Sequence, residues 1–317
     1  PFYRMIRDIL RFNRQAVEDL DAGRIDASMT LGNYLADRGY GQAFREYYLV
    51  PMGAAIWSAD RAAMLDFPLA FFVRFFRNHG LLSVKNRPQW RVIEGGSRES
   101  IKPLTAGFSE RMRTRTPVTG IRRGVIEGGV ELTLEDGSTE RFDHVVLACH
   151  SDQALALLRD PSVAERDVLG AIPYQKNDVV LHTDVRMLPR ERRAWSSWNY
   201  QLSSGEQRPT LTYNMNILQG LKAPDTFCVT LNNTQAINPH KILGRFDYDH
   251  PVFTLEGMRA QERWDEINGT GTWYCGAYWR NGFHEDGVVS GLRVARALAA
   301  PLSQDSAITA RMAVSAA

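Results

Sequence analysis

The segment CGAYWRNGFHEDGVVSG, residues 275–291, has residue types and a spacing that suit the binding of an electron-rich group. A short apolar stretch stops at Gly276, an aromatic and polar loop follows, and a helical pattern continues to about residue 300. A strand, a glycine turn and a helix in this order offer free backbone N–H groups at a helix N-terminus, where negative charge is stabilised. His284 is a candidate for moving a proton near neutral pH; the alternative is that only its backbone matters.

The sequence lacks the motifs of other common chemistries. It has no GxSxG nucleophile elbow, no HExxH or similar metal spacing among its seven histidines, and no Walker loop. The stretch GTGTWYCG, residues 269–276, differs from a dinucleotide fingerprint because its third glycine is displaced. We therefore expect neither a nucleophilic hydrolase nor a metal site.

The bulk composition is typical of a soluble globular protein. The 317 residues are 44% hydrophobic and 23% charged, and the formal net charge of +2 is too small to indicate nucleic-acid binding. No uncharged run approaches the roughly 18 residues of a membrane span. The three cysteines are far apart and predict reduced, buried thiols, so we expect a cytoplasmic protein.

The elements that position these residues fall into segments that alternate between two predicted domains. Residues 1–82 are predicted to be the helical part of a substrate domain, with a loop at LVPMGAAIWS. Residues 83–165 start with a strand, a glycine turn and a helix in WRVIEGGSRESIKPL, and EDGS indicates a hairpin among the β segments that follow. Residues 166–255 predict an antiparallel sheet, residues 256–300 return to the domain of 83–165, and residues 301–317 are a tail. The predicted fold class is α/β (mixed α+β), with two interleaved domains.

Aromatic residues are candidates for contact with an apolar substrate. Five of them follow a helical pattern on one side of a predicted helix: Phe67, Phe71, Phe72, Phe75 and Phe76. Such a stripe predicts either core packing or the lining of an apolar channel, and Phe72 is our candidate for substrate contact. A second group lies in the glycine-rich loop and either walls a substrate site or packs the loop: Tyr278, Trp279 and Phe283.

Three segments of the chain resemble, in order and approximate spacing, the flavin-containing amine oxidase superfamily, which includes carotenoid-type desaturases. They are GGSRESIKPL…RMRTRTPVTGIRR, FDHVVLACHSDQALALL and CGAYWRNGFHEDGVVSGLRVARAL. Within the superfamily the chain is most similar to bacterial predicted NAD/FAD-binding proteins related to the flavin-type N-terminal region of plant cyclopropane fatty acid synthases. The resemblance implies FAD as cofactor and an FAD/NAD(P)-binding Rossmann-like domain interleaved with a substrate domain of antiparallel sheet plus helices.

The resemblance also implies roles for individual residues. Val118 matches a strand residue whose main chain meets the adenine ring of FAD, and Gly276 and Ala277 match the turn beside the flavin and ribityl chain. Phe283 matches a substrate-cage aromatic, and the backbone N–H of His284 matches one that meets the flavin pyrimidine ring. With the acidic neighbour Glu285 added, the predicted cofactor-binding residues are Val118, Gly276, Ala277, Phe283, His284 and Glu285. The carboxylates at 285 and 286 are expected to point away from the flavin edge.

The sequence departs from the family pattern in three places. The N-terminal dinucleotide-binding fingerprint is missing, so we expect the fold to be incomplete at its N-terminus and this chain to hold FAD weakly or not at all. The lysine that amine oxidases place near flavin N5 should fall at about Val179, with Lys176 a few residues away. Tyr278 occupies a position where the amine oxidases usually have an acid.

These observations predict an FAD-dependent oxidoreductase that takes a hydride from an apolar small-molecule substrate, a fatty acyl chain or other lipid among them. The alternatives are an amine oxidase proper and a non-catalytic domain that binds lipid or a partner. The expected partners are therefore the apolar substrate, a membrane surface in peripheral contact, and the missing dinucleotide-binding segment. Nucleic acid is not expected.

Overall fold

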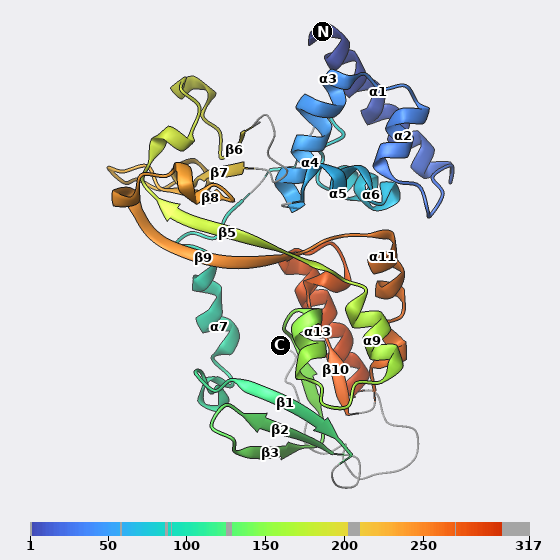
Figure 1. Cartoon of the computed structure of the whole chain (residues 1–317), viewed down its shortest axis with the longest axis vertical. Helices are drawn as coiled ribbons and strands as arrows, with labels where there is room; N and C mark the ends of the chain where they lie inside the picture. Colours follow the sequence, from blue (N-terminus) through green and yellow to red (C-terminus); the bar gives the residue numbers. More distant parts are fainter. Residues whose placement is uncertain are drawn as a thin grey trace. The chain divides into compact units, whose positions relative to one another are not determined.

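The computed structural model describes residues 2–57, 59–85, 88–89, 91–124, 129–201, 210–269 and 271–299. The chain divides into two compact units, each assembled from two separate stretches (Figure 1). Unit 1 comprises Pro1–Met112 and Tyr174–Leu255, and unit 2 comprises Arg113–Pro173 and Glu256–Ala317. The divisions fall after residues 112 and 173, whereas the sequence analysis placed them after 82 and 165. The predicted tail, 301–317, lies outside the described residues.

Unit 1 begins with a group of helices: α1 (Phe2–Asp21), α2 (Leu31–Asp37), α3 (Gln42–Phe44), a π-helical turn (Arg45–Leu49), α4 (Val50–Trp57), α5 (Arg61–Leu65) and α6 (Leu69–Asn78). Side-chain oxygens of Thr30 and Asp60 accept backbone N–H groups in the first turns of α2 and α5, which stabilises those helix starts. The core is aromatic, with Phe12, Phe44, Phe67, Phe72 and Phe76 fully buried.

The predicted loop at LVPMGAAIWS is wrong, because most of it forms α4. Pro51 directly follows the π-helical turn, which continues into α4 without a break, with the Val50 N–H donating to the Arg45 carbonyl. Gly53 lies against α5, and a Cβ there would come within 2.4 Å of the Met64 methyl group. Packing of Gly53 against α5 therefore favours this helix, although glycine and proline in its sequence are typical of a loop.

The second part of unit 1 is a five-stranded antiparallel sheet in the order β6-β7-β8-β5-β9, which confirms the sheet predicted for this region. The strands are β5 (Tyr174–His182), β6 (Trp198–Gln201), β7 (Thr210–Asn214), β8 (Cys228–Leu231) and β9 (Ile242–Pro251), and α10 (Met215–Gln219) follows β7. β5 and β9 extend as a long twisted pair (Figure 1).

Residues 91–105 lie between the helices and unit 2 in the sequence. A 3₁₀ turn (Ser97–Ser100) and α7 (Ile101–Thr105) form there, followed by a second 3₁₀ turn (Ser109–Arg111). The strand predicted before the glycine turn does not form over residues 91–96, where Val92 and Ile93 are exposed and pair with no strand in the described chain. Without a neighbouring strand, apolar β-branched residues alone do not make a sheet.

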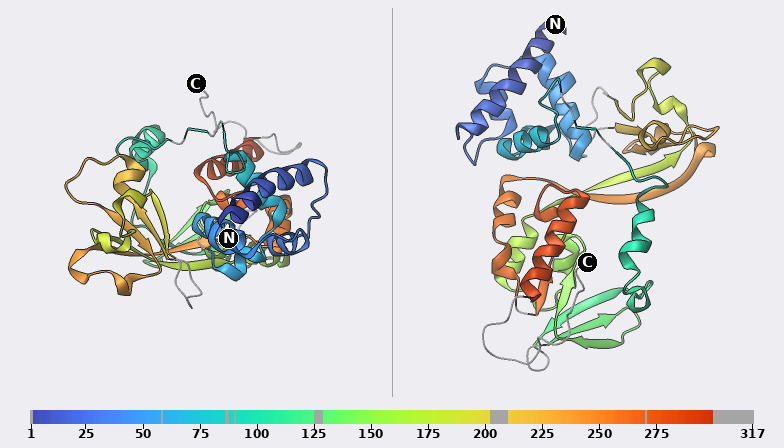
Figure 2. Two further views of the ribbon diagram at one scale, coloured as in Figure 1. Left: turned by 90° about the horizontal axis from the view of Figure 1, so that it is seen from above. Right: turned by 180° about the vertical axis from the view of Figure 1, so that it is seen from behind.

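Unit 2 contains two small sheets and several helices (Figure 2). The antiparallel sheet β1-β2-β3 consists of β1 (Val118–Arg123), β2 (Val130–Leu134) and β3 (Thr139–Phe142), and its β2–β3 hairpin turns at Gly137 as EDGS predicts. The parallel pair consists of β4 (Val145–Leu147) and β10 (Thr272–Tyr274). The helices are α8 (Ser151–Leu157), α9 (Val163–Gly170), α11 (Leu255–Glu262), α12 (Trp264–Ile267) and α13 (His284–Ala299).

A hydrogen bond to a buried ion pair joins the two stretches of unit 2. Arg123 on β1 donates two hydrogen bonds to Glu165 on α9, at 2.6 and 2.8 Å, and the Tyr274 hydroxyl on β10 donates a third at 2.5 Å. Burial raises the pKa of Glu165, but the hydrogen bonds from Arg123 and Tyr274 outweigh it and hold that pKa below its usual range. The carboxylate thus remains charged and fixes β10 beside the first stretch.

Candidate functional site

The turn at Gly276 is built by packing against α13. Cys275 continues the parallel pairing by donating its N–H to the Leu147 carbonyl at 3.0 Å. The Gly276 N–H then donates to the Ser290 hydroxyl of α13 at 3.1 Å. A Cβ on Gly276 would lie 2.4 Å from the ring of Tyr278, so only glycine fits beneath that ring. Burial raises the pKa of the Cys275 thiol, which keeps it protonated.

The loop after Gly276 is fixed from a second side by α11. Ala277, Tyr278 and Trp279 form a 3₁₀ turn. The Gln261 amide donates to the carbonyls of Tyr278 and Arg280, at 2.7 and 2.9 Å. The Tyr278 and Trp279 rings are buried with centroids 5.3 Å apart. The loop is therefore a rigid part of unit 2.

The first turn of α13 leaves backbone donors available. Asp286 occupies the third position of the helix, where its carboxylate accepts the Phe283 N–H at 3.0 Å and lies 3.7 Å from the Arg280 guanidinium. In the described part of the chain, the N–H groups of His284 and Glu285 have no protein acceptor. They lie at the positive end of the helix dipole, where an acceptor with negative charge is stabilised. The Asp286 carboxylate is engaged by the loop, as its predicted orientation away from a ligand requires.

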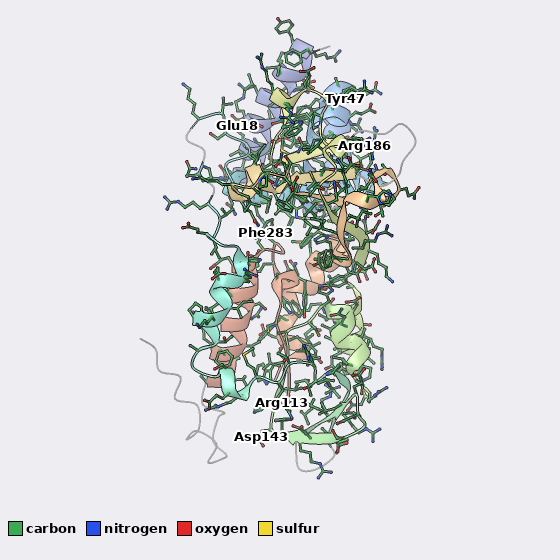
Figure 3. All side chains as sticks on the ribbon, turned by 90° about the vertical axis from the view of Figure 1, so that its left-hand side faces the viewer. Glu18, Tyr47, Arg113, Asp143, Arg186 and Phe283 are labelled. Carbon is green, nitrogen blue, oxygen red and sulfur yellow. The ribbon has the colours of Figure 1, made fainter. Side chains whose placement is uncertain are left out.

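Most of the predicted site residues therefore come from one continuous loop of unit 2: Gly276, Ala277, Tyr278, Trp279, Phe283, His284 and Glu285. Phe283, labelled in Figure 3, is 37% exposed, and His284 and Glu285 are also exposed. Val118 lies at the start of β1 in the same unit, next to a bulge in the β1–β2 pairing. Its assignment to the adenine ring stays a prediction, as do the roles of the loop residues.

Phe72 lies in unit 1, whereas the loop at residues 276–285 belongs to unit 2. The Phe72 side chain is fully buried. Its ring stacks on Phe76 at 4.0 Å and meets Trp57 at 5.7 Å and Phe12 at 6.3 Å. A side chain with no exposed surface has no area left for a substrate. The location of Phe72 agrees with the core-packing alternative for the aromatic stripe and not with substrate contact.

One face of the unit 1 sheet forms a second candidate surface. Opposed residues in an antiparallel sheet share a face, and the register places these apolar side chains on one side: Val179, Leu181, Trp198, Tyr200, Leu211, Tyr213, Val229, Leu231, Phe246 and Tyr248. We call this the aromatic face. Burial raises the pKa of Tyr213 to about 12, as expected for a phenol among apolar neighbours. Over the described residues of these strands, the aromatic face carries no carboxylate and no amine.

Val179 lies on this face, opposite Leu231 and Phe246, and is almost fully buried. Lys176 is three residues earlier on β5, so the alternation of side chains puts it on the other face, opposite Asp249. Val179, to which the resemblance assigns the lysine of the amine oxidases, is therefore an apolar side chain with no lysine beside it on the aromatic face of β5; the assignment itself stays a prediction.

Residues 10–205, more than half of the chain, match the family described as flavin containing amine oxidoreductase. The chain belongs to this family. The fold agrees, because a putrescine oxidase bound to putrescine superposes with a TM-score of 0.63 at 11% sequence identity, covering 93% of this chain and 75% of that one. A conjugated-linoleic-acid-producing (CLA-producing) fatty acid isomerase from P. acnes superposes with a TM-score of 0.61 at 15% identity, covering 92% and 74%. No curated protein matches the chain.

The loop residues fit the flavin that gives the family its name. The Trp279 indole N–H is buried and has no acceptor among the described residues, so it is available to a ligand. The unpaired N–H groups of His284 and Glu285 add donors at the same loop. Gly276 removes the side chain that would otherwise displace Tyr278. Such fixed donors suit a ring edge that becomes electron-rich on reduction.

The sequence analysis missed two residues that hold this loop, Ser290 and Gln261. Ser290 lies one turn after Asp286, and both side chains are buried on the inner side of α13. That i, i+4 polar pair within an otherwise apolar helix side was a usable signal. Gln261 offered none, because its contacts come from the tertiary packing of α11.

Proposed function

We propose that this protein is an FAD-dependent oxidoreductase that removes a hydride from an apolar substrate, with a fatty acyl chain as the substrate class. The observation that carries the proposal is the aromatic face, which has no carboxylate to attract a cationic amine among the described residues of its strands, and on which the apolar Val179 stands where the resemblance predicts a lysine. Burying a charged ammonium group against such a surface without a partner is costly, whereas a hydrocarbon chain gains from it.

The residues of each unit would contribute differently. The exposed part of the aromatic face in unit 1, at Trp198, Phe246 and Tyr248, would bind the hydrocarbon chain and exclude water. In unit 2, the N–H groups of His284 and Glu285 and the indole of Trp279 would orient the flavin and stabilise its electron-rich edge. When bound, the flavin would supply the chemistry by accepting the hydride.

His284 is the proposed proton acceptor. Loss of a hydride and a proton from adjacent carbons leaves a carbon–carbon double bond, and the exposed imidazole of His284 would take the proton. No residue of this chain is assigned to the pyrophosphate end of FAD.

The test uses the complete gene product, purified and incubated with FAD. We expect it to retain flavin absorbance after gel filtration and the flavin to be bleached anaerobically by a long-chain fatty acid or its ester, but not by putrescine. Absence of flavin binding would overturn the proposal. Bleaching by putrescine with peroxide release in air would instead identify an amine oxidase, the activity named for one of the structural neighbours.

A further inference from the structure

Helix α1 is held to unit 1 by one side only. Asp8, Phe12, Ala16 and Asp19 recur at helical spacing and are buried. Phe12 packs against the rings of Tyr40 and Phe44, with centroids 5.7 and 5.6 Å away. The helix is therefore a fixed part of the unit, and its opposite side faces away from this core.

That opposite side exposes apolar residues. Phe2, Ile6 and Leu10 follow the i, i+4, i+8 spacing of one helix stripe and are 62%, 38% and 51% exposed. Tyr3 lies beside them and is 88% exposed. We call these four residues the α1 stripe. No side chain of unit 1 covers it enough to bury it.

Arginines border the α1 stripe. Arg7 and Arg14 alternate with Tyr3 and Leu10 at steps of four and three residues, so they form one row along the helix. Arg7 is exposed and pairs with no carboxylate among the described residues, and Arg14 lies 3.9 Å from Glu18. Arg4 is one turn before the buried Asp8 and lies beside Gly41 on that side of the helix, away from the α1 stripe. Arg11, by contrast, is turned inward to Asp8 and the Tyr40 ring.

Two nearby acids are engaged within unit 1. The Asp8 carboxylate is buried and accepts the Gly41 N–H at 3.0 Å, and Asp19 is bonded to Arg24, Arg38 and Tyr34. Glu18 is close to Arg14 alone, so the exposed side of α1 combines an apolar stripe with a net positive charge at Arg7. Helices of this kind lie in the interface of anionic membranes.

We propose that α1 docks on an anionic phospholipid surface, with the α1 stripe at the boundary of head groups and acyl chains and Arg7 and Arg14 at the phosphates. The contact is peripheral, since none of the described helices is long and apolar enough to cross a bilayer. A second copy of the chain fits less well, because packing two α1 stripes together would bring their arginine rows into mutual repulsion. The inference does not depend on the proposed flavin chemistry.

The test is co-sedimentation of the purified protein with vesicles of phosphatidylcholine, with and without phosphatidylglycerol. We expect binding only to the anionic vesicles, weakened by salt. Arg7→Gln with Arg14→Gln should weaken binding about 25-fold, from roughly fivefold per arginine. Leu10→Ser should weaken it about fivefold, because half of that side chain is already buried in the protein.

The matched controls change equally exposed residues elsewhere in unit 1. Leu243→Ser on β9, where Leu243 is 56% exposed, removes the same kind of side chain. Arg190→Gln with Arg193→Gln removes the same charge from another exposed segment. Both controls should bind like the unchanged protein. Equal losses in the controls, absence of binding to anionic vesicles, or a dimer that Leu10→Ser dissociates would each overturn the proposal.

Discussion

Replacement of Gly276 by alanine tests how the candidate flavin loop is held. The new Cβ would lie 2.4 and 2.7 Å from two atoms of the Tyr278 ring, closer than any stable contact. The ring is buried and its backbone is fixed by Gln261, so it cannot rotate away without repacking the loop. Overpacking of this kind costs about 1–3 kcal/mol, and loss of the hydrogen bond to Ser290 adds about 1 kcal/mol.

We therefore expect Gly276→Ala to lower the free energy of unfolding by about 3 kcal/mol, measured by urea denaturation. Gly291→Ala is the matched control, because Gly291 lies in α13 and a Cβ there would meet no atom within 4 Å. That change should stabilise by up to about 1 kcal/mol through helix propensity. If Gly276→Ala proves no more destabilising than Gly291→Ala, the account of the loop as a close-packed turn is refuted.

The other predictions concern the two cores. Glu165→Gln should destabilise by about 3 kcal/mol, because it removes the buried charged partner of the Arg123 guanidinium and leaves the more exposed Asp160 carboxylate, 3.6 Å away; Thr119→Ser, an exposed change on the same strand β1, is the control in the same denaturation assay. The pKa of Glu165 is lowered in the folded state, so its contribution to folding stability is complete above the unfolded pKa of about 4.3 and is lost as the pH falls through the folded pKa. Plots of stability against pH for the unchanged protein and Glu165→Gln should therefore converge in acid. Burial lowers the pKa of His182, so the unfolded chain takes up that proton first and stability should fall below about pH 6.5, a slope that His182→Gln should remove. Phe72→Ala should cost about 4 kcal/mol, measured by denaturation, and a loss below about 1 kcal/mol would contradict its place in the core.

Elements with strong local patterns could be predicted from the sequence. The periodic apolar residues of α1 and α6 and the Asp136–Gly137 turn of the β2–β3 hairpin each carry their own signal. α4 could not be predicted, because Pro51 and Gly53 resemble loop residues and only the packing of Met64 on Gly53 explains them. The strand expected before Gly95 failed for the opposite reason, since an apolar run was present but a partner strand was not.

The candidate site likewise has parts that the sequence indicates and parts that it does not. The loop from Gly276 to Glu285 is continuous in sequence, so its residue types and order were enough to propose it as a site, and its role stays a prediction. The hydrogen bonds from Gln261 and to Ser290 join elements that the sequence does not mark as neighbours. Phe72 shows the limit of a composition argument, because an aromatic helix side has the same pattern whether it lines a channel or fills a core.

The buried contact between Glu165 and Tyr274 spans 109 residues, and the second stretch of unit 1 lies between them. During synthesis from the N-terminus, β4 and α9 emerge well before β10, while residues 174–255 are still being made. Unit 1 thus has its whole chain available before unit 2 does. The ribosome must deliver residues 272–274 before the parallel pair can form, so the candidate flavin loop, which follows β10 directly, is among the last parts of the two units to acquire its structure.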